Sequence, residues 1–176
     1  MGRNKGDLAC SDDESQIDTM SIISSASENR SGVDEGEDEL SQAEMLEEKL
    51  KELIDLTTQK SSNGRITSFE SLCKAFSTKY FPDFVAGRRM TIMDSIERGL
   101  KKGKGSEQEV SAKLLVLLCL QLGSVGDCQE IYKEQKHILL TLMTDRSVSA
   151  AARAQVSFIN GSLSTFVSKV LFIAEI

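Results

Sequence analysis

The sequence lacks tryptophan, and its 176 residues include one proline, Pro82, two tyrosines and seven phenylalanines. β-Sandwiches and barrels need many turns, and their strands are rich in aromatic and β-branched residues. A chain so poor in proline and aromatics is therefore predicted to be all-α. Its length suffices for one or at most two small domains, each with a hydrophobic core.

Metal-binding and disulfide patterns are also missing. The four cysteines, Cys10, Cys73, Cys119 and Cys128, form no C-x-x-C pair, and His137 is the single histidine. Neither a zinc site nor a disulfide framework is indicated, so we expect no metal and no cofactor. The three later cysteines are expected to pack as small apolar groups in a reduced, intracellular protein.

The chain has neither an apolar signal segment at its amino terminus nor a run of 18 apolar residues. The first feature would indicate secretion, and the second would indicate a membrane-spanning helix. We therefore expect a soluble protein with no membrane partner.

The net charge of −6 conceals two unlike parts. Residues 1–48 hold three Lys/Arg and 14 Asp/Glu, whereas residues 49–176 hold 18 and 13. Residues 1–40 carry too few apolar groups to offset the entropy of ordering, and we expect a disordered, acidic, Ser-rich tail. Such a tail is either a solvated, solubilising extension or a docking and regulatory segment. Four hydroxyl residues beside its carboxylates are candidate phosphorylation sites, namely Ser11, Ser15, Thr19 and Ser21.

Helical spacing of apolar residues predicts a helical-repeat domain over residues 41–176. Ser41 and Glu44 fit a capping box, which predicts that the first helix begins there. Asn63 and Gly64 are expected to end it. Its apolar stripe comprises Leu46, Leu50, Leu53, Ile54 and Thr57.

A second helix is predicted before Pro82, which cannot continue a helix from the preceding residues. A third is expected to stop at the glycines of residues 101–105. The second stripe comprises Phe69, Leu72, Cys73, Phe76 and Tyr80, and the third comprises Met90, Ile92, Met93, Ile96 and Leu100.

A fourth helix is predicted to open with a second capping box, Ser106 to Glu109. Its segment 114–120 is apolar on every side, which is typical of a helix at the centre of a core. A fifth helix is expected to carry Ile131, Ile138, Leu139 and Leu142, a sixth Val148, Ala151, Ala152 and Phe158, and a seventh to run from Leu163 to Ala174.

The predicted hairpins begin near Gln42, Ala86 and Cys128, a period of about 43 residues that is typical of armadillo and HEAT repeats. In such an α-solenoid each helix pair covers the open apolar face of its neighbour. The final apolar stripe, residues 170–176, has no polar closing helix. We therefore expect the chain to be a fragment or a shortened form.

Three segments resemble the interferon-related developmental regulator family in their order and spacing. They are SDDESQIDTMS at 11–21, KLKELIDLT at 49–57, and RRMTIMDSIERGLKKGK at 88–104, the last followed by Ser106-Glu107-Gln108. The resemblance covers roughly residues 11–155. Residues 156–168 depart from the family pattern, as an insertion, an alternative exon or a gene-model error would produce.

The resemblance implies an armadillo-like helical fold and a non-enzymatic role in nucleus and cytoplasm. Family members resemble transcriptional co-regulators of differentiation that associate with histone-deacetylase-containing corepressor assemblies. They also resemble ribosome-associated repressors of translation. The resemblance therefore implies regulatory proteins, or else the ribosome or RNA, as partners, with no small-molecule substrate.

No residue set in the sequence fits a catalytic constellation. His137 has no neighbouring motif, and Asp94 and Glu97 are more simply explained by surface ion pairs with nearby cations. The glycines of residues 101–105 follow a helix and lack the order of a phosphate-binding loop. We therefore expect no enzymatic activity.

The segment 88–104 carries six cations against two carboxylates, a balance of +4. One interpretation is a solvated helix end, where the macrodipole favours cations. The other is a contact with RNA phosphates or an acidic partner, directed at the backbone because interleaved aromatics are absent. The candidate contact residues are Arg88, Arg89, Arg98, Lys101, Lys102 and Lys104.

Overall fold

The computed structural model describes residues 35–123 and 125–174, and these form helices and short connections without a strand. The all-α prediction is therefore confirmed for this part of the chain. The helices are α2 (Glu35–Leu56), α3 (Ser62–Thr78), α4 (Pro82–Lys102), α5 (Ser106–Leu122), α6 (Val125–Thr144) and α7 (Ala150–Ala174). None of these described helices is both long enough and apolar enough to cross a membrane.

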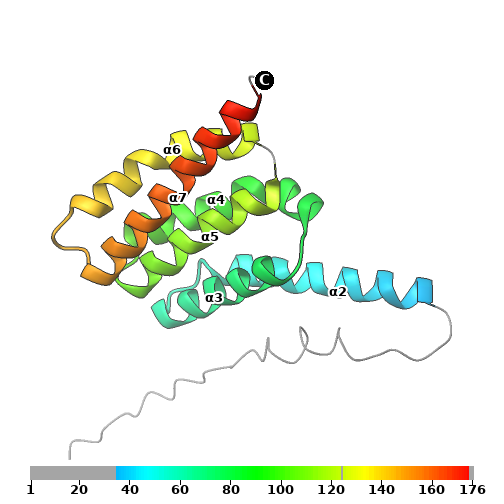
Figure 1. The fold of residues 1–176 in the computed structure, drawn as a ribbon. Coiled ribbons are helices and arrows are strands. Elements are labelled where there is room, and N and C mark those ends of the chain that lie inside the picture. Colours follow the sequence, from blue (N-terminus) through cyan, green and yellow to red (C-terminus); the bar gives the residue numbers. More distant parts are fainter. Residues whose placement is uncertain (1–34, 124, 175–176) are drawn as a thin grey trace, which may run out of the picture. The chain divides into compact units, whose positions relative to one another are not determined.

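Consecutive helices form three antiparallel hairpins, which begin at Glu35, Pro82 and Val125. The starts are 47 and 43 residues apart, as the armadillo/HEAT-like prediction requires. Helices α3, α5 and α7 pack side by side in one layer, and α2, α4 and α6 form the other (Figure 1). The described helices are therefore arranged as an α-solenoid of helical hairpins.

The start of α2 differs from the prediction. The helix begins at Glu35, so Ser41 lies inside it and is not the start of the helix that the capping box predicts. Three of the first four residues of α2 are acidic, and carboxylates there favour a helix start through the macrodipole. Residues 35–40, which the prediction placed in the tail, are helical. The rest of that tail, 1–34, lies outside the described residues.

The connection between α2 and α3 also corrects the prediction. Asn63 and Gly64 do not end the first helix, because they lie in the first turn of α3. The N-cap is Ser61, whose hydroxyl oxygen accepts a hydrogen bond of 3.3 Å from the backbone N–H of Gly64. Asn and Gly often end helices, but Ser61, two residues before Asn63, is an equally favourable N-cap for a new helix.

Helix α4 begins at Pro82, where a missing N–H costs nothing. In the second and third stripes two residues are exposed: Tyr80 lies beyond the end of α3 and is 63% exposed, and Met90 is 71% exposed. The predicted stop of α4 is confirmed, with Gly103 as its C-cap. At the start of α5, the second capping box is wrong, since the N-cap is Gly105 and no side chain caps the helix.

Helix α5 is the centre of the core, as predicted. It packs against α3, α4, α6 and α7, and Leu114, Leu115 and Leu118 are inaccessible to solvent. Leu120 is the exception within the apolar run, because its side chain is 54% exposed. The buried residues from all six described helices join in one hydrophobic cluster.

The last two predicted helices are one continuous helix, α7. Asn160 and Gly161 lie in its middle and do not interrupt it. The carboxamide oxygen of Asn160 accepts a hydrogen bond of 3.2 Å from the Tyr132 hydroxyl on α6. Phe158, expected on the apolar stripe, is 71% exposed, whereas Val156 and Ile159 are buried.

Candidate interaction surface

Three connections lie at the same end of the repeats: residues 57–61, 103–105 and 145–149 (Figure 1). Each joins the two helices of one hairpin. We call this end the turn edge. Because each turn belongs to a different repeat, side chains from positions about 43 residues apart become neighbours along it.

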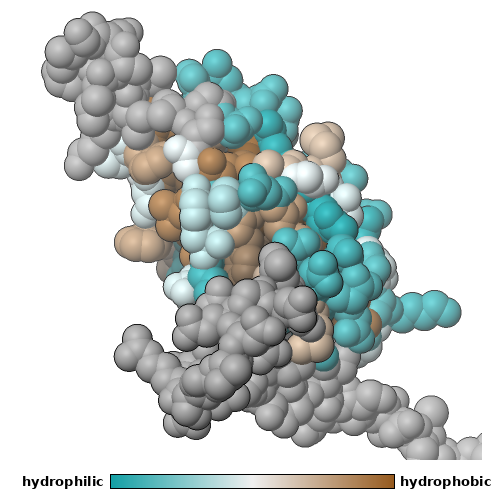
Figure 2. Space-filling view, turned by 90° about the vertical axis from the view of Figure 1, so that its right-hand side faces the viewer, coloured by the Kyte–Doolittle hydropathy of each residue, from teal (hydrophilic) through white to brown (hydrophobic). Residues whose placement is uncertain are grey.

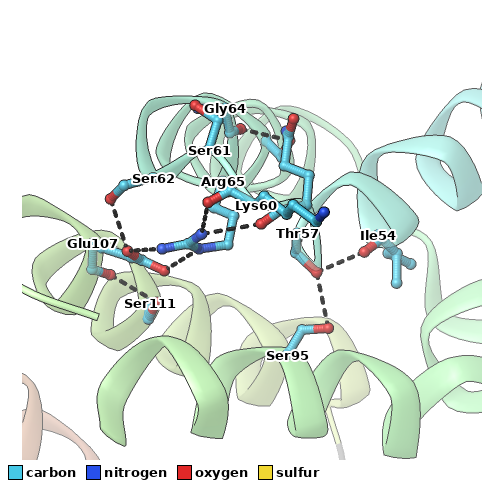
Figure 3. Close-up of polar contacts among 12 residues, drawn as sticks. Ile54, Thr57, Lys60, Ser61, Ser62, Gly64, Arg65, Ser95, Glu107 and Ser111 are labelled. Carbon is cyan, nitrogen blue, oxygen red and sulfur yellow. Dashed lines mark hydrogen bonds and ion pairs between the residues drawn. The ribbon is translucent and has the colours of Figure 1, made fainter. Parts of the chain in front are cut away.

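A buried ion pair connects the first hairpin to the second near the turn edge (Figure 3). The Arg65 guanidinium on α3 donates to both carboxylate oxygens of Glu107 on α5, at 2.6 and 2.9 Å. The Ser62 hydroxyl donates a third hydrogen bond to Glu107, at 3.0 Å. Only 4% of the Glu107 side chain is exposed, so the carboxylate depends on these donors for its solvation.

The electrostatics of this pair favour its charged form. The hydrogen bond from Arg65 lowers the pKa of Glu107, against the opposing effect of burial, and Ser62 lowers it further. The same bond raises the pKa of the Arg65 guanidinium. Glu107 also lies in the first turn of α5, where the helix dipole favours a negative charge.

Arg65 also fixes the first turn of the edge. Its second terminal nitrogen donates to the carbonyl oxygens of Gln59 and Lys60, at 3.0 and 2.8 Å. The second turn, residues 103–105, packs closely against the same Glu107 side chain. A Cβ on Gly103 would lie 2.8 Å from Cγ of Glu107 and 2.3 Å from the Gly99 carbonyl oxygen. One buried pair therefore positions two turns relative to each other.

A second polar contact joins the same two hairpins on the other layer. The Thr57 hydroxyl lies 2.9 Å from the Ser95 hydroxyl on α4, and 2.6 Å from the Ile54 carbonyl oxygen (Figure 3). Both hydroxyl residues are buried. Satisfied buried hydroxyls fix the register of packed helices, because a displaced partner would leave a polar group unpaired.

Arg89, a predicted contact residue, forms ion pairs within the protein. It donates to Asp127 at 2.7 Å and to Glu130 at 2.5 Å, and so ties α4 to α6. The hydrogen bond to Glu130 raises the pKa of Arg89 despite its partial burial. This residue is therefore an inter-repeat contact.

Two more of the predicted contact residues have intramolecular partners. The Arg88 guanidinium lies 4.8 Å from the centre of the Phe84 ring, in a cation–π contact. Lys101 pairs with Glu97 one turn earlier, and this hydrogen bond is the main reason why the pKa of Glu97 is lowered. The predicted surface ion pairing of Glu97 is confirmed.

Exposed cations gather at the turn edge and in the turn of helix before it. None of the five has an ion-pair partner among the residues whose side chains are described; they are Lys60, Arg98, Lys102, Lys104 and Arg146. We call them the turn-edge cations. The three turns contain one carboxylate, Asp145, which accepts a hydrogen bond of 2.8 Å from the backbone N–H of Ser147.

Sequence reasoning found three of these cations and missed Lys60 and Arg146. A signal for both was present, because Lys60, Lys102 and Arg146 are spaced by 42 and 44 residues. This is the predicted repeat period, and residues one period apart occupy equivalent positions of an α-solenoid. Applied to charged residues as well as to helices, the period would have pointed from Lys102 to Lys60 and Arg146.

The opposite end of the repeats is more apolar. In the view onto that end, hydrophobic residues reach the surface between hydrophilic ones (Figure 2). Two exposed residues belong to it: Tyr80 in the α3–α4 connection, and Leu120 in the last turn of α5. A Cβ on Gly123, one turn after Leu120, would lie 3.0 Å from the Tyr80 hydroxyl oxygen. We call Tyr80 and Leu120 the apolar end.

The remaining candidate residues are placed as follows. His137 is exposed on α6, as expected, and Asp94 is exposed on α4. No group of three or more His, Cys, Asp or Glu side chains is placed to hold a metal ion within the part of the chain that the structure describes. The predicted phosphorylation sites Ser11, Ser15, Thr19 and Ser21 lie outside the described residues.

Comparison with known proteins identifies similar chains. The family model "Interferon-related developmental regulator (IFRD)" matches residues 19–168. Interferon-related developmental regulator 1 of Homo sapiens is 41% identical over 155 residues, which are 86% of this chain and 34% of the relative. Interferon-related developmental regulator 2 of Mus musculus is 40% identical over 136 residues, 77% and 31% of the two chains. The chain thus spans about a third of the length of these curated relatives.

Proposed function

The chain belongs to the interferon-related developmental regulator family, and on that premise we propose that it is a non-enzymatic scaffold that regulates differentiation by binding other proteins. The proposed partners are transcriptional corepressor assemblies that contain histone deacetylases. Helical-repeat proteins bind partners through extended surfaces that successive repeats build together. A co-regulator of this kind works in the nucleus.

The apolar end is the observation that carries this proposal. Tyr80 and Leu120 keep 63% and 54% of their surface exposed, whereas most apolar side chains in the described part of the chain pack inside. Tyrosine is one of the side chains that most often anchor protein interfaces. Tyr80 also offers a hydroxyl for a partner's polar group.

Affinity purification from crosslinked nuclei tests the corepressor proposal. We expect the chain to recover histone deacetylases, and the variant Tyr80→Glu/Leu120→Glu to lose most of that recovery. The matched control is Met90→Glu/Phe158→Glu, which adds the same charge at two positions that are both 71% exposed on other surfaces. Equal recovery by both variants would contradict the proposal.

A second candidate function, repression of translation at the ribosome, is favoured by the turn-edge cations. Unpaired lysines and arginines in a row suit a phosphate backbone, and binding of this kind releases counterions and weakens steeply with salt. No aromatic side chain lies among the five, so the contact would be directed at phosphates and not at bases. This role belongs to the cytoplasm.

Ribosome binding in a salt series tests the second candidate. We expect Lys60→Glu/Lys102→Glu/Lys104→Glu to bind more weakly and with a shallower salt dependence, by roughly 0.7 in log K against log salt per lost phosphate contact. The control is Lys79→Glu/Lys113→Glu/Lys133→Glu, three exposed cations elsewhere. If both variants behave alike, the turn edge is only a solvated set of helix ends.

A further inference from the structure

Tyr80, one of the two residues of the apolar end, lies in a short connection between two helices. Helix α3 ends at Thr78 and α4 begins at Pro82. The Tyr80 side chain is 63% exposed, so it makes few contacts of its own. Its position therefore depends on the backbone of the connection that carries it.

One buried side chain from another helix binds that backbone on both sides of Tyr80. Gln121 lies in the last turn of α5 and is 3% exposed. Its carboxamide nitrogen donates to the carbonyl oxygen of Lys79 at 2.6 Å. Its carboxamide oxygen accepts from the backbone N–H of Phe81, also at 2.6 Å. These groups belong to the peptide bonds before and after Tyr80, so one carboxamide fixes both peptide planes.

The same carboxamide also binds the end of α3. The Gln121 nitrogen donates a further hydrogen bond, 2.8 Å long, to the carbonyl oxygen of Phe76. This is one of the last four carbonyls of α3, which lack partners within the helix. A glutamine side chain has two N–H donors and one oxygen, and here all of them are used on a single connection. The opposite orientation of the carboxamide would place its oxygen against two carbonyl oxygens.

Packing supports the connection at two further points. The rings of Phe76 and Phe81 lie with their centroids 6.3 Å apart. On the other side, a Cβ on Gly123 would lie 3.0 Å from the Tyr80 hydroxyl oxygen. Gly123 is the C-cap of α5 and has a φ of 62°, a conformation that favours glycine. The end of α5 thus leaves room for the tyrosine ring while Gln121 holds its backbone.

We propose that Gln121 is a positioning residue of the apolar end, which holds Tyr80 in one orientation so that a partner protein meets a preformed anchor. This inference rests on the proposed role of Tyr80 in binding partners. A preformed anchor strengthens binding, because less conformational freedom is lost when the partner docks. Gln121 itself is buried and acts through the backbone on either side of Tyr80.

A second buried glutamine of α5 provides a matched comparison. Gln108 is 6% exposed and donates one hydrogen bond of 3.2 Å, to the carbonyl oxygen of Leu100. It lies in the first turn of the helix, at the turn edge, whereas Gln121 lies in the last turn. Replacement of Gln108 therefore removes the same side chain from the same helix, far from Tyr80.

Amide hydrogen exchange tests the contact in the unaltered 176-residue chain. The acceptor of the Phe81 N–H is the Gln121 side chain, so its protection reports this contact. We expect NMR to show exchange at Phe81 that is roughly tenfold or more slower than in an unstructured peptide. Exchange at the unstructured rate would overturn the proposal, whether or not any variant folds.

Tyrosine fluorescence follows Tyr80 itself. The chain has two tyrosines and no tryptophan, so Tyr132→Phe leaves Tyr80 as the sole emitter. In this background we expect Gln121→Leu to enlarge the fast component of the anisotropy decay, because the backbone groups beside Tyr80 would turn to water. Gln108→Leu should leave the decay as it is in the parent. An unchanged fast component in Gln121→Leu would overturn the proposal.

Recovery of histone deacetylases from crosslinked nuclei gives the functional readout. Gln121→Leu keeps both Tyr80 and Leu120, yet we expect it to lose most of the recovery. Gln108→Leu should retain the recovery, with circular dichroism confirming an equal helical signal in the two variants. Equal recovery by the two variants, or an equal loss, would overturn the positioning role.

The three measurements separate this inference from the corepressor proposal. If the parent recovers no histone deacetylase, the corepressor proposal fails, and exchange and anisotropy still decide whether Gln121 fixes Tyr80. If Tyr80→Glu/Leu120→Glu loses recovery while Gln121→Leu keeps it, the apolar end binds the partner and the positioning role is contradicted.

Discussion

The guanidinium of Arg65 on α3 and the carboxylate of Glu107 on α5 form a two-point contact, 2.6 and 2.9 Å long, between residues 42 positions apart. The pair lies where the turns of the first and second repeats meet (Figure 3). Arg65 binds the carboxylate of Glu107, whose side chain is almost fully buried. It also donates hydrogen bonds to the carbonyl oxygens of residues 59 and 60. The contact thereby links packing between repeats to the position of the turn edge.

Removal of the charge on Glu107 should destabilise the domain. Glu107→Gln leaves the Arg65 guanidinium without its anionic partner in a largely buried place, and we expect a loss of about 2 kcal/mol. Urea unfolding measures it. The control is Glu48→Gln, which breaks an exposed pair with Lys51 and should cost less than about 0.5 kcal/mol. Equal effects of the two substitutions would contradict the role of the buried pair.

The same pair predicts a pH dependence of stability. The pKa of Glu107 is lower in the folded than in the unfolded protein, where it is about 4.3. The stabilisation is therefore fully present above the unfolded pKa and is lost as pH falls through the folded one. The free energy of unfolding of the parent should exceed that of Glu107→Gln at pH 7, and the difference should shrink below about pH 4. A difference that stays constant to pH 3 would contradict this cause.

Two glycines of α4 should respond in opposite directions to alanine. A Cβ on Gly99 would lie 2.0 Å from the Ser111 hydroxyl oxygen and 3.3 Å from the Phe69 ring, so α4 and α5 would have to separate. We expect Gly99→Ala to cost about 1–3 kcal/mol. A Cβ on Gly87 would meet nothing within 4 Å, and Gly87→Ala should stabilise by about 0.5–1 kcal/mol. Thermal unfolding followed by circular dichroism distinguishes the two.

Helix α5 offers a matched test of the core. Leu118 is fully buried, so Leu118→Asp would place an uncompensated carboxylate in the core and should unfold the domain. Leu120→Asp, two residues along the same helix, introduces the same group at a position that is 54% exposed and should leave the helical signal intact. A folded Leu118→Asp protein would show that α5 is not central.

The sequence predicted the helices well because apolar periodicity reports burial directly. Leu50, Ile96 and Leu139, one residue from each of three predicted stripes, are buried as their spacing requires. Helix ends were less predictable, because several residues compete to cap each helix. Ser41 does not begin α2, because the helix starts six residues earlier in an acidic segment. Ser106 is not the N-cap of α5, because Gly105, with a positive φ of 52°, takes that position.

Contacts between repeats could not be predicted from local pattern. Nothing near Arg65 or Glu107 in the sequence indicates that they meet, because their partners lie a whole repeat away. The contact segment 88–104 was recognised by charge alone, and charge does not distinguish Arg89, which pairs internally, from Lys102, which is exposed. Only the fold separates structural cations from available ones.

Photo-crosslinking in cells is the measurement that tests the binding account most directly. A benzophenone amino acid would replace Leu120 at the apolar end, Lys102 at the turn edge, or Phe158 on α7 as an exposed control. The account predicts corepressor proteins at position 120, ribosomal RNA or ribosomal proteins at position 102, and neither at position 158. The same partners at all three positions, or their capture at position 158 alone, would contradict it.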